Sequence, residues 1–198
     1  MVKKNVKELI IKSAIGLFSE KGYKDTSIRD ISLAADINSA LIYYYFKNKE
    51  EVLYTIIESD TLELINLLNN IKKVEPDPLK CIEKMISNHT IFVSEHDKTT
   101  KIINNNTDQL SNDQNLKQIE LQRKVYNIYM NELKNIKKAG LLKPVNLALL
   151  NFVILGMLNW FYRWYDKDGP LSGSELAEQM IDIVFRGALI YEQGNKQE

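Results

Sequence analysis

Three consecutive tyrosines, Tyr43 to Tyr45, are the residues whose types and spacing best suit them to binding another molecule. Successive residues of a helix point about 100° apart, so the three rings cannot all be buried in one core. Ile42 and Phe46, four residues apart, are the better core pair. The tyrosines are therefore expected mostly at the surface, where their phenol groups can reach the phosphates or base edges of a nucleic acid.

The segment that carries the tyrosines reads as two short helices joined by a tight turn. Ser27 and Asp30 have the spacing of an N-terminal capping pair for the first helix. Asp36 can adopt the left-handed conformation that turns the chain, and Asn38 can cap a second helix over Ser39–Tyr45. This pattern is typical of a helix-turn-helix, which presents its second helix to the major groove of DNA.

The stretch from Ile10 onward places several independent features in one order. It reads IIKSAIGLFSEKGYKDTSIRDISLAADINSALIYYYFKNKEEVL, with an amphipathic helix, a Gly-Tyr pair, Thr-Ser, two short helices and a Tyr-Tyr-Tyr-Phe-Lys-x-Lys-Glu-Glu run. In these features the chain resembles the TetR family of bacterial regulators. It departs from the family pattern at Asp36, where Gly is common, and at Leu41, where a small hydroxyl residue is common. A leucine at position 41 can touch a thymine methyl group or the sugar edge instead of forming a hydrogen bond.

The resemblance implies which side chains would contact DNA. The candidates for reading bases are Ser39, Ala40 and Tyr43. The candidates for binding phosphates are Thr26, Ser27, Tyr44, Tyr45 and Lys49. Arg29 could reach either part of the DNA, and its alternative is a surface ion pair with Asp30 or Glu20.

Composition is that of an ordinary globular chain. Of its 198 residues, 44% are apolar and 26% are charged, which is enough for a packed core and excludes a disordered chain. The net charge is zero, but residues 1–55 hold nine Lys/Arg and seven Asp/Glu, a net of +2, which leaves −2 on residues 56–198. The asymmetry has the sign that DNA binding requires. Cys81, the single cysteine, cannot form an internal disulfide, and no signal peptide is recognisable, so a cytoplasmic protein is expected.

Helical periodicity continues along the whole chain, and no alternating strand pattern is present. The predicted helices are Val6–Lys21, Ser27–Ala35, Ser39–Tyr45, Asn48–Lys73, Leu79–Ser94, Leu116–Lys138, Asn146–Tyr165 and Gly173–Tyr191, with a polar, less regular stretch over Lys98–Asn115 and a loop or poorly held helix within residues 104–115. We therefore predict an all-α fold. Residues 1–50 would form a three-helix, homeodomain-like DNA-binding domain, and residues 51–198 a helical ligand-binding and dimerisation domain.

The segment Leu147–Tyr162 is the most apolar part of the chain. It has 16 residues and contains two asparagines, whereas a bilayer requires about 20 apolar residues, so a buried helix is expected and no membrane span. The last two helices each carry two apolar faces, which indicates a subunit interface. The resemblance implies a homodimer through a four-helix bundle. Its expected interface residues are Leu176, Met180, Ile183, Val184, Gly187, Ala188 and Tyr191.

Aromatic residues and methionines of the second domain could line a cavity for a small hydrophobic effector. The candidates are Phe92, Tyr126, Met130, Phe152, Met157, Trp160, Arg163 and Trp164, and simple core packing is the alternative for each apolar one. The run NWFYRWYDKDGPLS resembles TetR-family members that respond to acyl-CoA thioesters. Arg163 could pair with a phosphate while an indole stacks on adenine, or it could instead pair with Asp166 or Glu178. A long-chain acyl-CoA is therefore the candidate effector.

No group of residues suggests catalysis, and neither a metal nor a cofactor is expected. His89 and His96 lie seven residues apart without a cysteine or carboxylate at ligand spacing, so solvated or hydrogen-bonded histidines are the better interpretation. The sequence predicts a non-enzymatic regulator, a repressor that a hydrophobic effector releases from a palindromic operator. The alternatives are a regulator of drug efflux that responds to hydrophobic or cationic compounds, and a helical ligand-binding or enzymatic protein of the same fold that does not bind DNA.

Overall fold

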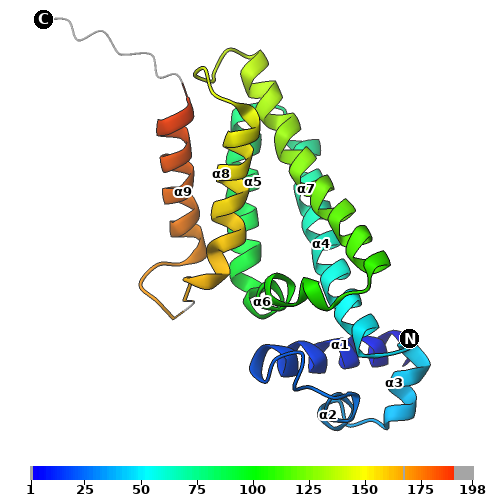
Figure 1. Cartoon of the computed structure of the whole chain (residues 1–198). Coiled ribbons are helices and arrows are strands. Elements are labelled where there is room, and N and C mark those ends of the chain that lie inside the picture. The colour runs from blue at the N-terminus through cyan, green and yellow to red at the C-terminus, as the bar shows by residue number, and fades with distance from the viewer. Residues whose placement is uncertain (1, 167, 190–198) are drawn as a thin grey trace, which may run out of the picture. The chain divides into compact units, whose positions relative to one another are not determined.

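The chain folds as helices joined by short loops, as predicted. A computed structural model describes residues 2–166 and 168–189. Its elements are α1 (Val2–Glu20), α2 (Ile28–Ala34), α3 (Ser39–Tyr45), α4 (Lys49–Val74), α5 (Pro78–Glu95), α6 (Asp97–Asn106), the 3-10 turn η1 (Thr107–Gln109), α7 (Asn112–Lys138), α8 (Leu147–Trp160), the 3-10 turn η2 (Phe161–Arg163) and α9 (Gly173–Ala188) (Figure 1). Within the described ranges, β pairing is limited to an isolated antiparallel bridge between Leu142 and Leu189. The all-α prediction is confirmed.

The helices form two compact units, each made from two segments of chain. Unit 1 comprises residues 1–63 and 96–123, and unit 2 comprises residues 64–95 and 124–198. The expected boundary at residue 50 differs from this division, because the first half of α4 carries core residues of unit 1. Both α4 and α7 contribute to both units.

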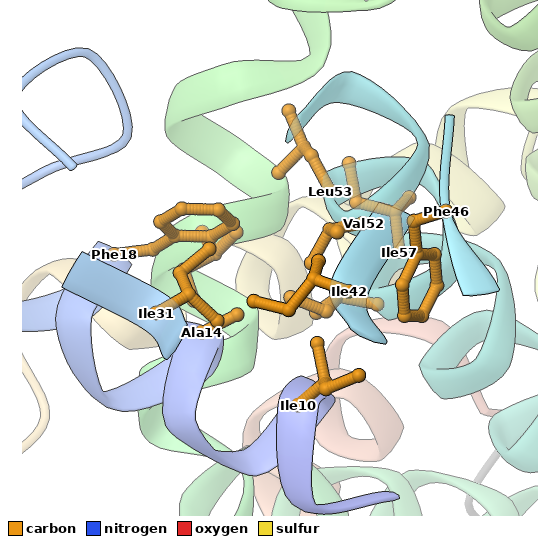
Figure 2. Packing of buried hydrophobic residues seen from close by; sticks show 11 residues of the cluster. Ile10, Ala14, Phe18, Ile31, Ile42, Phe46, Val52, Leu53 and Ile57 are labelled. Carbon is orange, nitrogen blue, oxygen red and sulfur yellow. The ribbon is translucent and has the colours of Figure 1, made fainter. Parts of the chain in front are cut away.

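An apolar cluster lies in the core of unit 1 (Figure 2). Its buried residues are Ile10, Ala14, Phe18, Ile31, Ile42, Phe46, Val52, Leu53, Ile56, Ile57 and Ile102. The predicted core pair Ile42 and Phe46 is confirmed, at 0% and 2% exposure. Ile102 comes from α6, a helix within the stretch that the sequence left irregular. Because this isoleucine and Thr100 are buried, packing holds a segment whose polar composition alone does not favour a helix.

In unit 2, α5, α8 and α9 run side by side (Figure 1). Gly173, the first residue of α9, allows a close approach to α5, since a Cβ atom there would lie 2.5 Å from the Oγ of Ser94. The helix α8 ends at Trp160, five residues earlier than predicted. There Phe161 is fully buried, with its ring stacked on Tyr165 and edge-on to Trp164, and its carbonyl accepts hydrogen bonds from both of their backbone N–H groups.

Helix ends follow the local signals in the sequence. Gly22 after α1 and Gly140 after α7 have positive φ angles of 88° and 76°, the left-handed conformation that ends a helix. Asn146 caps α8 by accepting hydrogen bonds from the backbone N–H groups of Ala148 and Leu149. Among the described helices, none has the length and apolarity needed to cross a membrane.

Candidate nucleic-acid interface

The first helix of the helix-turn-helix begins with a complete capping box. Ser27 Oγ accepts a hydrogen bond from the backbone N–H of Asp30, and the Asp30 carboxylate accepts one from the backbone N–H of Ser27 at 2.8 Å. The hydroxyl of Ser27 also donates to this carboxylate at 2.6 Å. These bonds, with the nearby Lys21 ammonium, lower the pKa of Asp30 to about 2. The predicted capping pair is confirmed, and it fixes where α2 begins.

The turn between α2 and α3 is built as the sequence predicted. Asp36 has a φ angle of 51°, in the left-handed region. Asn38 then caps α3, its side-chain oxygen accepting from the N–H of Leu41 at 2.8 Å. The hydroxyls of Ser32 on α2 and Ser39 on α3 are hydrogen-bonded at 3.0 Å. This bond fixes one helix against the other, but it also engages the hydroxyl of Ser39, a predicted base-reading group.

The three tyrosines occupy different environments. Tyr43 and Tyr44 are 57% and 66% exposed, and Ala40 is exposed on the same helix. Tyr45 is half-buried, and its ring meets the Tyr44 ring edge-on at 5.1 Å between centroids. The phenols of Tyr43 and Tyr44 therefore lie on the open surface of α3, whereas Tyr45 supports its neighbour from behind.

Lys49, a predicted phosphate contact, is engaged within the chain. Its ammonium donates hydrogen bonds to the backbone carbonyls of Tyr23 and Thr26, both at 2.7 Å, and to that of Lys24 at 3.3 Å. It also lies 4.2 Å from the centroid of the Tyr23 ring. Desolvation lowers the pKa of this lysine. A phosphate contact would require Lys49 to give up one of these three carbonyls, since an ammonium has three donors.

Thr26 has an equally internal role. Its side chain is 1% exposed, and the hydroxyl donates to the carbonyl of Gly22 at 2.8 Å and lies 3.4 Å from that of Leu17. The Thr26 side chain is therefore held inside the turn between α1 and α2, and its role as a phosphate contact stays a prediction. The exposed members of the predicted set are Ser27, Arg29, Ala40, Tyr43 and Tyr44, all on α2, its N-cap or α3.

Two residues important to this surface were not identified from the sequence. Tyr23 receives the Lys49 ammonium and meets Phe18 edge-on at 5.2 Å. Its only sequence signal is its place in the Gly-Tyr pair. Ser32 is buried on α2 and bonds Ser39, but in the sequence it is only a small polar residue in a predicted helix, with nothing to mark this role.

The predicted effector residues in unit 2 fall into two groups. Phe92 is buried, and the half-buried members are Tyr126, Met130 and Met157. By contrast, Phe152, Trp160 and Trp164 are between 52% and 65% exposed, which places them on the surface of the described chain and not inside a closed cavity. The ring of Phe152 is nevertheless 5.6 Å from that of Tyr126.

Arg163, the last residue of η2, contacts two aromatic rings with its guanidinium group. Its guanidinium carbon is 5.1 Å from the centroid of the Trp160 ring and 5.6 Å from that of Tyr162, and its Nε donates to the Tyr162 hydroxyl at 3.0 Å. These contacts, and not the alternative ion pairs with Asp166 or Glu178, are those that hold this side chain. Its remaining N–H groups can bind an anion.

The predicted dimer residues of α9 likewise divide between core and surface. Met180 and Val184 are buried in unit 2, Leu176 is half-buried, and Ile183 and Gly187 are exposed. The side chain of Ala188 and all of Tyr191 lie outside the described residues. The exposed apolar residues of α8 are Leu149, Phe152, Val153 and Trp160. They recur at helical spacing and add a second apolar strip to this surface.

Both histidines form hydrogen bonds, which is the interpretation that the sequence favoured over metal binding. His89 is buried with its Nδ1 3.1 Å from the Tyr129 hydroxyl, which itself donates to the Met85 carbonyl. Since a phenol donates one proton, Nδ1–H of His89 must be the donor of the first bond. Burial lowers the pKa of His89 to about 4. His96 instead bonds Asp60 at 2.7 Å, and the described residues hold no cluster that could bind a metal.

Comparison with known proteins identifies the family to which the chain belongs. The KstR2 repressor of Mycobacterium tuberculosis is 23% identical over 90% of each chain. The structure of PfmR, a TetR-family regulator from Thermus thermophilus, is 29% identical and covers 89% of this chain and 97% of its own, with a TM-score of 0.85. AibR, solved with isovaleryl coenzyme A and operator DNA, superposes with a TM-score of 0.83 at 22% identity over 91% of this chain and 98% of its own. Residues 10–55 match the bacterial regulatory proteins of the tetR family, and residues 75–188 match the tetracyclin repressor-like C-terminal domain. The chain is therefore a DNA-binding transcriptional regulator that belongs to the TetR family.

Proposed function

We propose that this regulator is a homodimeric repressor that leaves its operator when a CoA thioester binds unit 2. The observation that carries the DNA-binding half of the proposal is the capped α2–α3 pair with Tyr43 and Tyr44 exposed on α3. In this geometry the N-terminal residues of the second helix reach base edges. KstR2, a relative along most of the chain, is named a transcriptional repressor, which supports the sign of the response.

The dimer rests on the apolar residues that α8 and α9 leave uncovered. Phe152 and Ile183 are 65% and 66% exposed in the single chain. Large apolar patches of this kind on a soluble protein mark interaction sites. If a second copy covers them, each Å² of apolar surface that is buried contributes about 25 cal/mol to the stability of the dimer. A dimer presents two copies of α3 to DNA, so a near-palindromic operator with half-sites about 34 Å apart, or a multiple of this, is expected.

The CoA assignment rests on Arg163 and its two aromatic neighbours. A guanidinium held against Trp160 and Tyr162 can bind a phosphate with its outer N–H groups, while the exposed indole of Trp164 can stack on an adenine ring. AibR, which shares the fold, was solved with isovaleryl coenzyme A and operator DNA. Half-buried Tyr126, Met130 and Met157 would contact the acyl part, and each buried methylene would contribute about 0.8 kcal/mol.

Release from DNA requires that the ligand prefer the form that does not bind the operator. A tenfold loss of operator affinity corresponds to a preference of about 1.4 kcal/mol. The helix α4 is continuous and contributes residues to both units, so it provides a covalent route for this coupling.

The test is titration calorimetry of the full chain with a length series of acyl-CoAs that includes isovaleryl coenzyme A, paired with operator binding at saturating ligand. The operator is sought first in the DNA beside the protein's own gene by mobility shift. We expect affinity to rise with chain length and operator affinity to fall at least tenfold. Free fatty acids and cationic drugs are the comparison ligands. Tight binding of a cationic drug with no heat from any CoA thioester would instead favour a regulator of drug efflux.

The Arg163→Ala variant separates head-group binding from chain binding. It should weaken CoA thioesters more than the matching free fatty acids. Equal losses for both ligand types would remove Arg163 from the site, and binding that leaves operator affinity unchanged would remove the proposed release.

A further inference from the structure

A hollow in unit 1 takes no part in the site or the function described above. Its volume is about 670 Å³, and its walls come from α1, the end of α3 and the first half of α4. The residues that line it are Lys7, Glu8, Ile11, Lys12, Ile15, Tyr45, Thr55 and Ser59. Small-molecule sites in proteins have volumes of about 300–1,000 Å³, so this one has the size of a ligand pocket.

The floor of the hollow is apolar. Ile11, Ile15 and Tyr45 are partly buried and pack against the back of the unit 1 core. The hydroxyls of Thr55 and Ser59 donate to backbone carbonyls of α4, at 2.8 and 3.1 Å, so their protons are already used within the helix. A ligand here would meet mainly carbon atoms, and the main driving force for binding would be the burial of apolar surface.

The rim of the hollow is charged. Lys7 and Lys12 line it together with Glu8, and all three side chains are exposed. The Lys7 ammonium lies 5.4 Å from the centroid of the Phe46 ring, and this contact holds the lysine against unit 1. Two ammonium groups against one carboxylate favour an anionic group at the mouth.

We propose that this hollow binds a single-chain anionic amphiphile, with the alkyl chain on Ile11 and Ile15 and the carboxylate between Lys7 and Lys12. Each additional buried methylene should strengthen binding about fourfold. The site is separate from the proposed CoA site, because every residue that lines it belongs to unit 1.

Such a ligand would act directly on the DNA-binding unit. Tyr45 is both a wall of the hollow and the edge-on neighbour of the exposed Tyr44. A chain seated against Tyr45 therefore contacts the ring that supports a DNA-facing tyrosine. The hollow gives the protein a second input that does not pass through unit 2.

The experiment is methyl NMR of the full chain with ¹³C-labelled isoleucine δ1 groups, titrated with dodecanoate below its micelle concentration. The signals of Ile11 and Ile15 are assigned with the Ile11→Val and Ile15→Val variants. We expect both signals to shift and saturate. Changing Lys7 and Lys12 together to Gln should weaken binding about fivefold. Dodecyltrimethylammonium, with the same chain and the opposite charge, should bind more weakly than dodecanoate.

A filling variant tests the location without disturbing the core. Ser59 is exposed on α4, so Ser59→Trp can occupy the hollow and should abolish the dodecanoate shifts. Glu63→Trp, one turn further along the same face, is the matched control and should leave them intact.

Three outcomes would overturn the proposal. They are Ile11 and Ile15 signals that do not respond to dodecanoate, shifts confined to isoleucines of unit 2, and signals that move with protein dilution alone, which would make the hollow a contact between copies of the chain. None of these results bears on CoA binding in unit 2, and a failure of CoA binding would leave this site untouched.

Discussion

The ammonium of Lys49 hydrogen-bonds the backbone carbonyl of Tyr23 at 2.7 Å and lies 4.2 Å from the centroid of the same residue's ring. With its bonds to two further carbonyls, this lysine fastens the start of α4 to the loop between α1 and α2. The main role of Lys49 in the folded chain is therefore to hold this loop in place.

Replacing Lys49 by Met should lower the stability of the whole chain by about 2 kcal/mol, since it removes hydrogen bonds from a charged donor while keeping the aliphatic stem. Chemical denaturation of the purified variant measures this. Lys47→Met, which changes an exposed lysine two residues away, is the control and should have little effect. A Lys49→Met protein with unchanged stability and a flatter salt dependence of operator binding would restore the phosphate role.

Operator binding should be dimeric and strongly salt-dependent. Removing one lysine or arginine contact to a phosphate lowers the slope of log affinity against log salt by about 1. Tyr44→Phe should instead weaken binding to all DNA sequences alike and leave the slope unchanged, because a neutral phenol neutralises no phosphate charge. Tyr43→Ala should in addition relax the preference between operator and mismatched DNA. Fluorescence anisotropy at several salt concentrations checks both, and a Tyr43→Ala protein with full discrimination would exclude base contact by this residue.

The dimer should depend on the outer face of α9. Ile183→Glu places a charge on a residue that is 66% exposed in the single chain, so the fold of the protomer should survive while a dimer that buries this position should not. Gly187→Glu should act in the same direction, because a Cβ atom there would meet nothing within 4 Å in the protomer, whereas a glutamate would obstruct a close-packed partner. Light scattering after size exclusion measures the mass. Glu178→Lys, on another face of the same helix, should remain a dimer.

Acid should destabilise unit 2 through His89. Its pKa is about 4 in the folded chain against an ordinary value of 6.5, so between these values the unfolded chain binds the extra proton and stability falls as pH falls. The loss between pH 7 and pH 4 should be about 3 kcal/mol. His89→Gln keeps a donor for Tyr129 but does not titrate, and its stability should fall less over this range. Identical pH profiles for both proteins would mean that His89 is not buried in solution.

Asp30 should change the stability of the protein over a separate, more acidic pH range. Because its folded pKa is lowered to about 2, its contribution is present at neutral pH and is lost only as pH falls from about 4 towards 2. The two effects can therefore be told apart in one titration.

Features that depend on near neighbours in the chain were predictable from the sequence. The capping box of Ser27 and Asp30, the positive φ angle of Asp36 and the cap at Asn38 are all set by residues within three positions of one another. The split of the tyrosines from Ile42 and Phe46 follows from helical geometry alone. For these reasons α3 was predicted with the bounds that the structure shows.

Features that depend on distant partners were not predictable. Nothing near Thr26 or Lys49 in the sequence indicates that both would be satisfied by backbone carbonyls of the turn after α1. The same holds for α6, whose polar sequence folds around the buried Ile102. His96 on this segment finds Asp60 of α4, 36 residues away, at 2.7 Å. Each case requires the tertiary fold to be known first.

The division of α4 and α7 between the two units sets a limit on how the protein can be taken apart. Unit 1 needs residues 96–123 as well as residues 1–63, so a fragment cut after the helix-turn-helix would lose Ile102 and the α4 residues that close its core. A hybrid regulator made by joining this DNA-binding unit to a foreign sensor should therefore exchange residues 64–95 and 124–198 together. This exchange needs three junctions, two inside the continuous helices α4 and α7 and one between α5 and α6, and a single junction in a loop would not suffice. Modular evolution of such proteins would face the same constraint, because a recombination at one point leaves each half without a piece of its own core.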